Sequence, residues 1–254
     1  MDKRLYEKLY KKYNKVFVVS KEAESRLIQR IPGIKEKSEV FYNILSKELI
    51  GELAKKEVSF DDNYKGLKVV TVGRLAKEKG QDLAINTLLK LREAGYEIRW
   101  YCIGEGNKRK EFEDLIKKNH LDNDFILLGA VTNPYPFIAK SDIYVQTSRH
   151  EGYCITLAEA RCLNKPIVTT NFIGAHEQIK EGINGYIVEA NEEQLFNKIK
   201  YLIDNQQQRN SLVENLKSTN LDTTKEVYKR YRWNHLHTNK ERLPERTAAK
   251  GSDK

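Results

Sequence analysis

The sequence lacks the features of several protein classes. Only 5 prolines and 14 glycines occur in 254 residues, which excludes collagen-like and linker sequence. No uninterrupted apolar run is long enough for a transmembrane helix, and residues 1–8 have no apolar core of a secretory signal. The three cysteines, Cys102, Cys154 and Cys162, form no C-x-x-C pair, which argues against a disulfide scaffold or a cysteine zinc site. These absences predict a cytoplasmic protein.

The composition instead favours a globular chain with a basic surface. Hydrophobic residues make up 39% of the sequence, which excludes a mostly disordered chain and suits one large α/β domain or two small ones. The net charge is +9, from 45 basic and 36 acidic residues. Such a charge suits nucleic acid, an anionic membrane or phosphorylated ligands. Because the basic residues alternate with acidic ones, as at 77–79 and 108–111, no nucleic-acid partner is expected.

Short apolar runs alternate with helical patterns along most of the chain. Strands are predicted at 16–19, 39–42, 67–72, 97–103, 124–128, 142–146, 166–169 and 185–188. Helices are predicted at 21–29, 81–94, 107–119, 153–163 and 191–204, with shorter turns near 135–140 and 175–180. This alternation predicts an α/β fold, a Rossmann-like parallel sheet with helices on both faces, because parallel strands need crossover helices. Ligands of such sheets bind outside the carboxyl ends of the strands.

The chain divides into five predicted parts. Residues 1–45 are too few for a stable domain and look like the edge of something larger, and 46–66 form a polar connector. The regular α/β domain covers 67–218, followed by a helical segment at 219–233 and a flexible tail at 234–254.

Two cations follow the strand at 67–72. Gly73 allows a sharp turn and a close ligand approach, Arg74 offers a planar fork of donors, and Lys79 stands at the start of the next helix. Two cations and a helix N-terminus at one place would bind a diphosphate. A solvated charged turn is the alternative. The nearby Gly104-Glu105-Gly106 is not a dinucleotide motif, because Arg109 stands at the third glycine position.

Two carboxylates with seven residues between them mark the segment after the strand at 142–146. Glu151 precedes the predicted helix, whose N-terminus at 152–154 presents free N–H groups, and Glu159 lies inside it. Since one carboxylate can accept two hydroxyls, the pair suits two diols of one ligand. A glycosidase-like acid/base pair or two surface charges are alternatives.

The combined motifs resemble the donor-binding C-terminal half of glycosyltransferase family four, the retaining enzymes of GT-B fold. The resemblance spans about residues 67–203 and rests on Gly73-Arg74 with Lys79-Gly80, Phe125 with Gly129, Ser141-Asp142, Glu151 with Glu159-Ala160, Lys165-Pro166, Gly174 with Glu177, and Asn184-Gly185. Residues 10–45 resemble the last strand and helix of the family's N-terminal domain with its linker. Residues 1–45 would thus be a remnant of that domain, and 219–233 a helix that crosses back to it.

The resemblance implies transfer of a sugar from a nucleoside diphosphate sugar, UDP- or GDP-linked, with retention, in bacterial polysaccharide or glycan synthesis. Arg74 and Lys79 would hold the diphosphate and offset the leaving-group charge, and Glu151 would bind the hydroxyls of the transferred sugar. The other implied donor-binding residues are Gly73, Gly129, Ala130 and Val131 beside the nucleobase, Gly152, Tyr153, Cys154 and Ile155 at the helix start, and Glu159 on the ribose. No cofactor and no metal are implied.

The sequence departs from the family pattern at two positions and in its length. Cys154 stands where a glycine is usual, and the run Arg161-Cys162-Leu163-Asn164 stands where a run of small residues is usual. We expect Arg161 to point to solvent or to the sheet edge. The acceptor-binding N-terminal domain is missing or supplied by a partner chain. A non-catalytic nucleotide-sugar-binding subunit, a degenerate remnant and a sugar-nucleotide epimerase are therefore alternatives. The basic aromatic segments 5–13 and 227–233 would meet the missing domain or, peripherally, a membrane, and exposed apolar surface is expected at 5–45 and 222–233.

Overall fold

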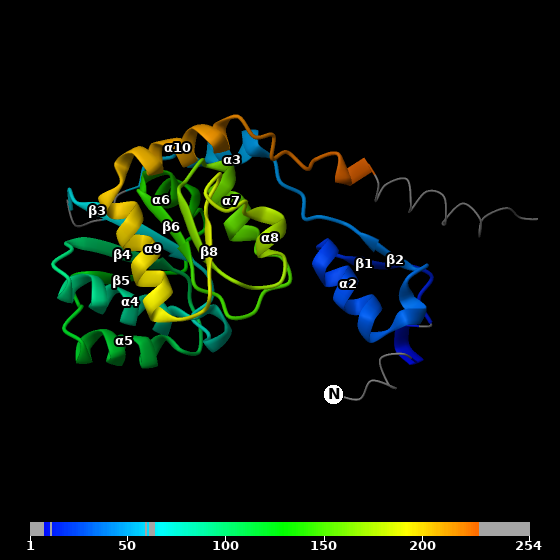
Figure 1. Ribbon diagram of the computed structural model, residues 1–254, viewed down its shortest axis with the longest axis horizontal. Coiled ribbons are helices and arrows are strands. Elements are labelled where there is room, and N and C mark those ends of the chain that lie inside the picture. Colours follow the sequence, from blue (N-terminus) through cyan, green and yellow to red (C-terminus); the bar gives the residue numbers. More distant parts are fainter. Residues whose placement is uncertain (1–7, 11, 59, 61–63, 229–254) are drawn as a thin grey trace, which may run out of the picture.

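The computed structural model describes residues 8–10, 12–58, 60 and 64–228. They form a larger α/β unit and a small N-terminal unit joined by an extended linker (Figure 1). The predicted tail at 234–254 and residues 229–233 of the predicted crossover helix lie outside the described residues.

A six-stranded parallel sheet forms the centre of the larger unit. Its strands are β3 (Leu67–Val72), β4 (Ile98–Ile103), β5 (Phe125–Gly129), β6 (Ile143–Gln146), β7 (Ile167–Thr170) and β8 (Tyr186–Val188), in the order β5-β4-β3-β6-β7-β8. The chain starts at β3, builds outward to β5, and then returns to place β6 on the other side of β3. This topology confirms the predicted Rossmann-like sheet, and each of its strands lies within one residue of its predicted bounds.

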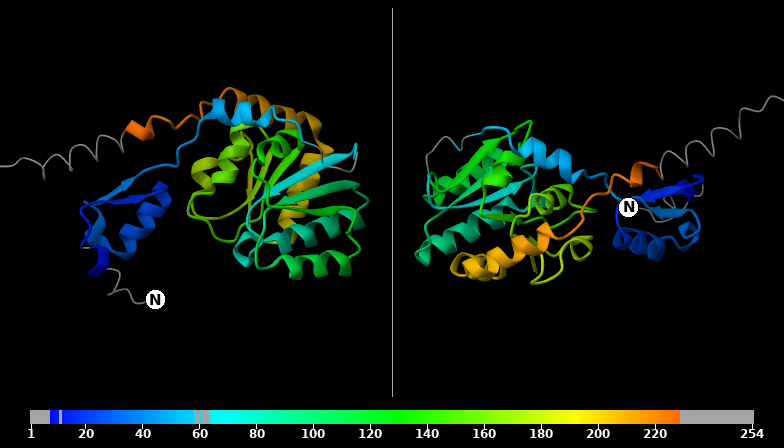
Figure 2. Two further views of the ribbon diagram at one scale, coloured as in Figure 1. Left: turned by 180° about the vertical axis from the view of Figure 1, so that it is seen from behind. Right: turned by 90° about the horizontal axis from the view of Figure 1, so that it is seen from above.

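Helices cover both faces of the sheet, as predicted (Figures 1 and 2). One face carries α4 (Gln81–Glu93), α5 (Arg109–Lys118) and α9 (Glu192–Asp204), and the other carries α6 (Tyr135–Lys140), α7 (Ile155–Cys162) and α8 (Ala175–Gln178). Successive strand residues serve opposite layers: Val69 belongs to the first apolar cluster and Val70 to the second. The helix α10 (Gln206–Lys217) buries Leu212 against the first cluster.

The predicted connector begins with a helix that packs on the larger unit. Helix α3 (Lys47–Ala54) starts at Ser46, whose hydroxyl accepts from the backbone N–H of Leu49. Its Ile50 is buried with Ala158 and Cys162 of α7. Cys102 and Cys154 are buried as well, so all three thiols occupy the interior. Within the described part of the chain no helix is both long and apolar enough to cross a membrane.

The N-terminal unit is a two-stranded parallel sheet with one crossover helix. Strands β1 (Val16–Val18) and β2 (Ser38–Val40) are joined by α2 (Lys21–Arg30) and a 3-10 turn, η1 (Pro32–Ile34). The hydroxyl of Ser20 caps α2 by accepting from Ala23 N at 3.1 Å. The expected exposed apolar surface is confirmed for the described residues by Leu9, Tyr13, Phe17, Val19, Ile44, Val227 and Tyr228.

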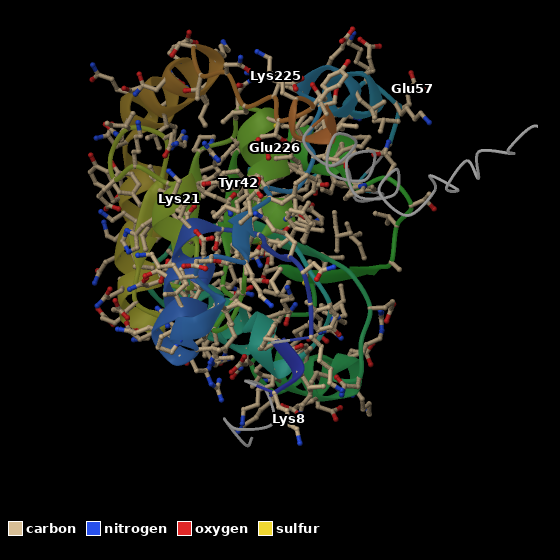
Figure 3. All side chains as sticks on the ribbon, turned by 90° about the vertical axis from the view of Figure 1, so that its right-hand side faces the viewer. Lys8, Lys21, Tyr42, Glu57, Lys225 and Glu226 are labelled. Atoms are coloured by element: carbon tan, nitrogen blue, oxygen red, sulfur yellow. The ribbon has the colours of Figure 1, made fainter. Side chains whose placement is uncertain are left out.

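The segment after α10 returns to the linker. Thr223 N donates to Leu45 O at 3.0 Å, and Leu45 N donates to the Thr223 hydroxyl at 2.8 Å. That hydroxyl in turn donates to Asn43 O at 2.8 Å. Figure 3 shows Lys225 and Glu226 above Tyr42 as a result. The segment that follows the larger unit is therefore hydrogen-bonded to the linker that precedes this unit.

Candidate functional site

The order in which strands are added to the sheet reverses between β3 and β6, because β4 and β5 lie on one side of β3 and β6 lies on the other. The loops that follow β3 and β6 contact each other there. Gly80, the residue before α4, has φ +69°, and a Cβ at this position would lie 2.1 Å from Thr147 O. The Thr147 hydroxyl donates to Lys79 O at 3.0 Å. Only glycine fits so close an approach with a positive φ. The carboxyl ends of β3 and β6 thus form one rigid rim at the point where α/β sheets bind ligands.

A cation and a carboxylate from these two loops meet at the rim. Lys79 Nζ lies 2.6 Å from Glu151 Oε1, with the side chains only 19% and 11% exposed. The 3-10 turn η2 (Lys77–Lys79) aims the lysine inward, and its methylene chain passes Gly73, where a Cβ would lie 3.7 Å from Cδ. Breaking so shielded a pair by removing one partner costs about 3–5 kcal/mol. Lys79, Glu151 and Gly73 therefore converge as the sequence suggests.

Arg74 does not join this pair. Its side chain is 73% exposed and forms an ion pair of 2.7 Å with Glu78, four residues later. Such an exposed pair contributes at most about 1 kcal/mol, so it can open when a stronger anion is present. The backbone of Arg74 is better fixed, because its carbonyl accepts from the amide of the buried Gln81 at 2.7 Å.

The second carboxylate, Glu159, lies in α7 and has a partner that sequence reasoning missed. The Tyr135 hydroxyl donates to Glu159 Oε1 at 2.8 Å. Burial raises the pKa of Glu159 above its ordinary value, and the Tyr135 hydrogen bond opposes that rise. Burial and the neighbouring carboxylate together raise the pKa of Tyr135. The pair is thus an ionisable carboxyl beside a phenol that stays protonated.

The start of α7 presents unpaired backbone donors. The helix begins at Ile155, two residues later than predicted, and Cys154 precedes it without a side-chain cap. The N–H groups of Gly152, Tyr153 and Cys154 have no acceptor in the described residues. Ile155 is exposed, whereas Cys154 is 3% exposed and burial raises the pKa of its thiol to about 12. Cys154 therefore acts as a small buried group and not as a reactive thiol.

The loop after β5 lies beside the loops of β3 and β4. Gly104 N donates to Gly129 O at 2.8 Å, and a Cβ on Gly104 would lie 2.1 Å from Gly73 O. Gly104 is therefore needed for the close packing of these two loops. Beyond Gly129, Ala130 is exposed and Val131 packs partly on the second apolar cluster.

A cavity of about 280 Å³ opens beside Glu151. It is lined by Arg26, Arg149, His150, Glu151, Asn171, Phe172 and Ile173. Arg26 comes from α2, so the cavity lies between the two units. The Arg149 guanidinium is already bound to Asp82, to which it donates two parallel hydrogen bonds of 2.7 Å.

The N-terminal unit is fastened to the rim by Glu177 of α8. Its carboxylate accepts from the backbone N–H of Lys21 at 3.1 Å and of Glu22 at 2.7 Å, the free donors of the first turn of α2. It also accepts from Tyr42 OH at 3.1 Å, and Figure 3 shows Lys21 and Tyr42 close together. The Ser20 hydroxyl donates to Gly152 O at 3.2 Å. The sequence pattern contains Glu177 but gave no hint of this role.

One prediction is wrong: Arg161 points neither to solvent nor to the sheet edge. It lines a cavity of about 200 Å³ with Tyr42, Tyr153 and residues 220–223, because the linker and the returning segment cover α7. Its buried Nε has no hydrogen-bond partner among the described residues. Burial lowers the pKa of the Arg161 guanidinium.

The described part of the chain holds no group of three or more His, Cys, Asp and Glu side chains that could bind a metal. The sequence contains one D-x-D triplet, Asp122-Asn123-Asp124, whose two carboxylates are not part of the site. The triplet precedes β5 and so lies at the edge of the sheet opposite the rim. Asp124 there pairs with Arg92.

Comparisons with known proteins identify the family and the fold. Residues 54–219 match the family model described as glycosyl transferases group 1. The chain is 29% identical over 211 residues to the N-acetylgalactosamine-N,N'-diacetylbacillosaminyl-diphospho-undecaprenol 4-alpha-N-acetylgalactosaminyltransferase of Campylobacter jejuni, covering 82% of this chain and 56% of the relative. It is 28% identical over 174 residues to the UDP-N-acetylglucosamine–peptide N-acetylglucosaminyltransferase GtfA subunit of Streptococcus agalactiae, covering 68% and 33%.

Among solved structures, Anabaena HepE in complex with UDP-glucose superposes with a TM-score of 0.80 at 22% identity, covering 92% of this chain and 67% of that one. This likeness shows a GT-B fold. The chain spans about half the length of the C. jejuni relative.

Proposed function

The chain belongs to the glycosyl transferases of group 1, and we propose that it is the donor-binding half of a retaining glycosyltransferase that takes a sugar from a nucleoside diphosphate sugar. The observation that carries the proposal is the shielded Lys79–Glu151 ion pair, which lies where the carboxyl ends of β3 and β6 meet. The name of the S. agalactiae relative, which includes UDP-N-acetylglucosamine, and the UDP-glucose bound to HepE support such a donor.

Each charged group has a task in donor binding. Lys79 binds the diphosphate, and Arg74 leaves its weak pair with Glu78 to do the same, while the free N–H groups at 152–154 offer further donors to the phosphate oxygens. Negative charge grows on the diphosphate as its bond to the anomeric carbon breaks. Cations already in place lower that barrier, which is usually a large part of catalysis.

The sugar and the nucleoside lie on either side of the diphosphate. Glu151 accepts from hydroxyls of the transferred sugar, Glu159 from those of the ribose, and residues 129–131 border the nucleobase. In the retaining reaction the acceptor oxygen attacks from the side that the phosphate leaves. The bond from the anomeric carbon to the phosphate oxygen breaks, the new glycosidic bond forms, and the acceptor's proton goes to the departing phosphate. The reaction needs no cofactor or metal.

The acceptor is held by a further domain, carried on the same polypeptide or on a partner chain. The support is the N-terminal unit, where Phe17 of β1 is 41% exposed and Val19, just after this strand, is 37% exposed. Strand β1 has β2 on one edge and no strand on the other among the described residues, so the added domain extends this sheet. The product is a bacterial polysaccharide or other glycan, made in the cytoplasm or at the inner membrane face. A non-catalytic nucleotide-sugar-binding subunit is the second candidate, supported by the GtfA relative's name as a subunit.

Calorimetric titration with UDP, GDP and ADP tests the donor site. One of them should bind wild type, and Glu159→Gln should weaken it about tenfold or more, as expected for losing hydrogen bonds to a charged group. Glu214→Gln, which changes an exposed carboxylate whose ion-pair partner among the described residues is Lys217, is the matched control. Failure of a folded chain to bind any of the three nucleotides would refute the proposal. If a nucleotide binds, transfer to an added acceptor separates the enzyme from the binding subunit.

A further inference from the structure

Three buried polar side chains follow one another along β6 and the residues after it. Tyr144, Gln146 and Ser148 are each at most 1% exposed. They stand at every second position, so their side chains lie on the same face of the strand. A buried polar group costs free energy unless it is hydrogen-bonded. A row of three needs a continuous set of partners.

The partners form a relay that ends on Glu151. Tyr144 OH donates to Gln146 Oε1 at 2.6 Å, and Gln146 Nε2 donates to Ser148 Oγ at 2.8 Å. Ser148 Oγ donates to Glu151 Oε1 at 2.7 Å. A serine hydroxyl has one hydrogen. Because Ser148 accepts from Gln146, that hydrogen is left for Glu151.

Neighbouring elements fix the direction of the relay. The Thr156 hydroxyl of α7 lies 3.3 Å from Gln146 Oε1 and 3.4 Å from Val72 O, so the shorter bond from Tyr144 OH, at 2.6 Å, holds the oxygen end of this amide. The amide nitrogen must then face Ser148. From β7, the Thr170 hydroxyl bonds the carbonyl of Ser148, which fixes the backbone where the chain leaves the sheet.

The relay and Lys79 use the same oxygen of Glu151. Lys79 Nζ is 2.6 Å from Oε1, and Ser148 is 2.7 Å from it. In the described residues no donor reaches Oε2. Glu151 belongs to the lining of the cavity between the two units. One carboxylate oxygen is therefore fully used by the protein, while the other is left for a ligand.

We propose that Tyr144, Gln146 and Ser148 are positioning residues that hold Oε1 of Glu151 and so present Oε2 to the hydroxyls of the transferred sugar. This rests on the proposed donor site. The relay serves the sugar and not the nucleotide, because it ends on Glu151, while the ribose carboxylate Glu159 has its own partner in Tyr135. The relay thus sets how well the site distinguishes a nucleotide sugar from the free nucleotide.

The test compares two affinities in each variant. Wild type is titrated with UDP, GDP and ADP and with UDP-glucose, UDP-N-acetylglucosamine, GDP-mannose and ADP-glucose. For the nucleotide that binds, Ser148→Ala should weaken the nucleotide sugar about tenfold, as for a lost hydrogen bond to a charged group, and leave the free nucleotide within about twofold. Ser148→Thr, which keeps the hydroxyl, should restore the preference. Tyr144→Phe removes only the far end of the relay and should give a smaller loss of the same kind.

A matched control is Ser141→Ala. Ser141 is also buried, and its hydroxyl donates to Ile138 O at 2.8 Å, but it precedes β6 at the opposite edge of the sheet. It should change neither affinity. Equal weakening of nucleotide and nucleotide sugar by Ser148→Ala and Tyr144→Phe, or no change in either, would overturn the relay while leaving the donor site intact. A wild-type chain that binds no ligand of the panel would overturn both.

Discussion

The ammonium of Lys79 lies 2.6 Å from the carboxylate of Glu151, although 72 residues separate them in the sequence. The pair exists because β3 and β6 are neighbours in the sheet, and because Gly80 lets the loop after β3 touch the loop after β6. A ligand anion that binds Lys79 competes with Glu151 for it. Donor binding would therefore free the carboxylate as it engages the lysine, so that both groups turn to the ligand together.

Replacing Gly80 should lower the free energy of unfolding by more than its positive φ alone would. Gly80→Ala adds overpacking against Thr147 O to the cost of a positive φ, about 2–5 kcal/mol of unfolding free energy in all. Gly95→Ala is the control, because Gly95 also has a positive φ but has no atom within 4 Å of an added Cβ. It should cost about 1–2 kcal/mol. Equal losses in urea unfolding would show that the approach to Thr147 is not tight.

Removing the carboxylate of Glu177 should loosen the N-terminal unit. The N–H groups of Lys21 and Glu22 have no intrahelical partner, so Glu177 is their acceptor. In Glu177→Ala, hydrogen–deuterium exchange at these two amides should accelerate about tenfold or more, since a hydrogen bond to a charged group is lost. Glu214→Ala should leave them unchanged. Unaltered exchange in Glu177→Ala would mean that α2 is held by other contacts.

The cation at Arg161 should reduce stability. Burial lowers the pKa of the guanidinium, so the folded state disfavours the charged form, and this penalty is present below the pKa of the folded state and is lost as the pH rises through it. Arg161→Met replaces a half-buried guanidinium, whose Nε has no hydrogen-bond partner among the described residues, with an apolar chain and should raise the melting temperature by about 2–4 °C for each kcal/mol gained. Lys118→Met, at an exposed position near the end of α5, should have little effect. A lower melting temperature in Arg161→Met would reveal a stabilising partner for the guanidinium.

Nucleotide binding should weaken in acid because of Glu159. Its pKa is raised by burial, and the protonated carboxyl is a poorer acceptor, so affinity is complete above this pKa and falls as the pH drops through it. Tyr135→Phe removes the hydrogen bond that opposes the rise, so the midpoint should move to higher pH. Tyr96→Phe, which alters a tyrosine–carboxylate pair with Asp204 at the surface, should not move it. A midpoint that is the same in Tyr135→Phe would exclude Glu159 as its source.

Much of this fold could be predicted from sequence, because periodicity reports which residues face a core. The six central strands are short apolar runs, and their bounds agree with the structure to one residue. The loops after β3 and β6 could be singled out because parallel strands bring their carboxyl ends to one edge. The convergence of Lys79 with Glu151 follows from that topology.

Other features depend on contacts that periodicity does not reveal. Arg161 is covered by Tyr42 and residues 220–223, which are distant in sequence, so nothing near it signals burial. The exposed Arg74 side chain pairs with Glu78, and which partner an exposed side chain takes depends on its rotamer, which periodicity does not report. The relay has a sequence signal: Tyr144, Gln146 and Ser148 place polar groups at every second position of β6 and the residues that follow it. That pattern could have predicted a buried polar row, although not its end at Glu151.

The most direct test of the central claim is to map a nucleotide on the chain by NMR. Backbone amide shifts of labelled protein are followed as UDP, GDP or ADP is added. The account predicts that one nucleotide moves the amides of Gly73, Lys79, Gly129, Gly152 and Glu159, while those of α10, far from the rim, stay in place. Shifts confined to other surfaces, or none with any of the three, would contradict a donor site at the ends of β3 and β6.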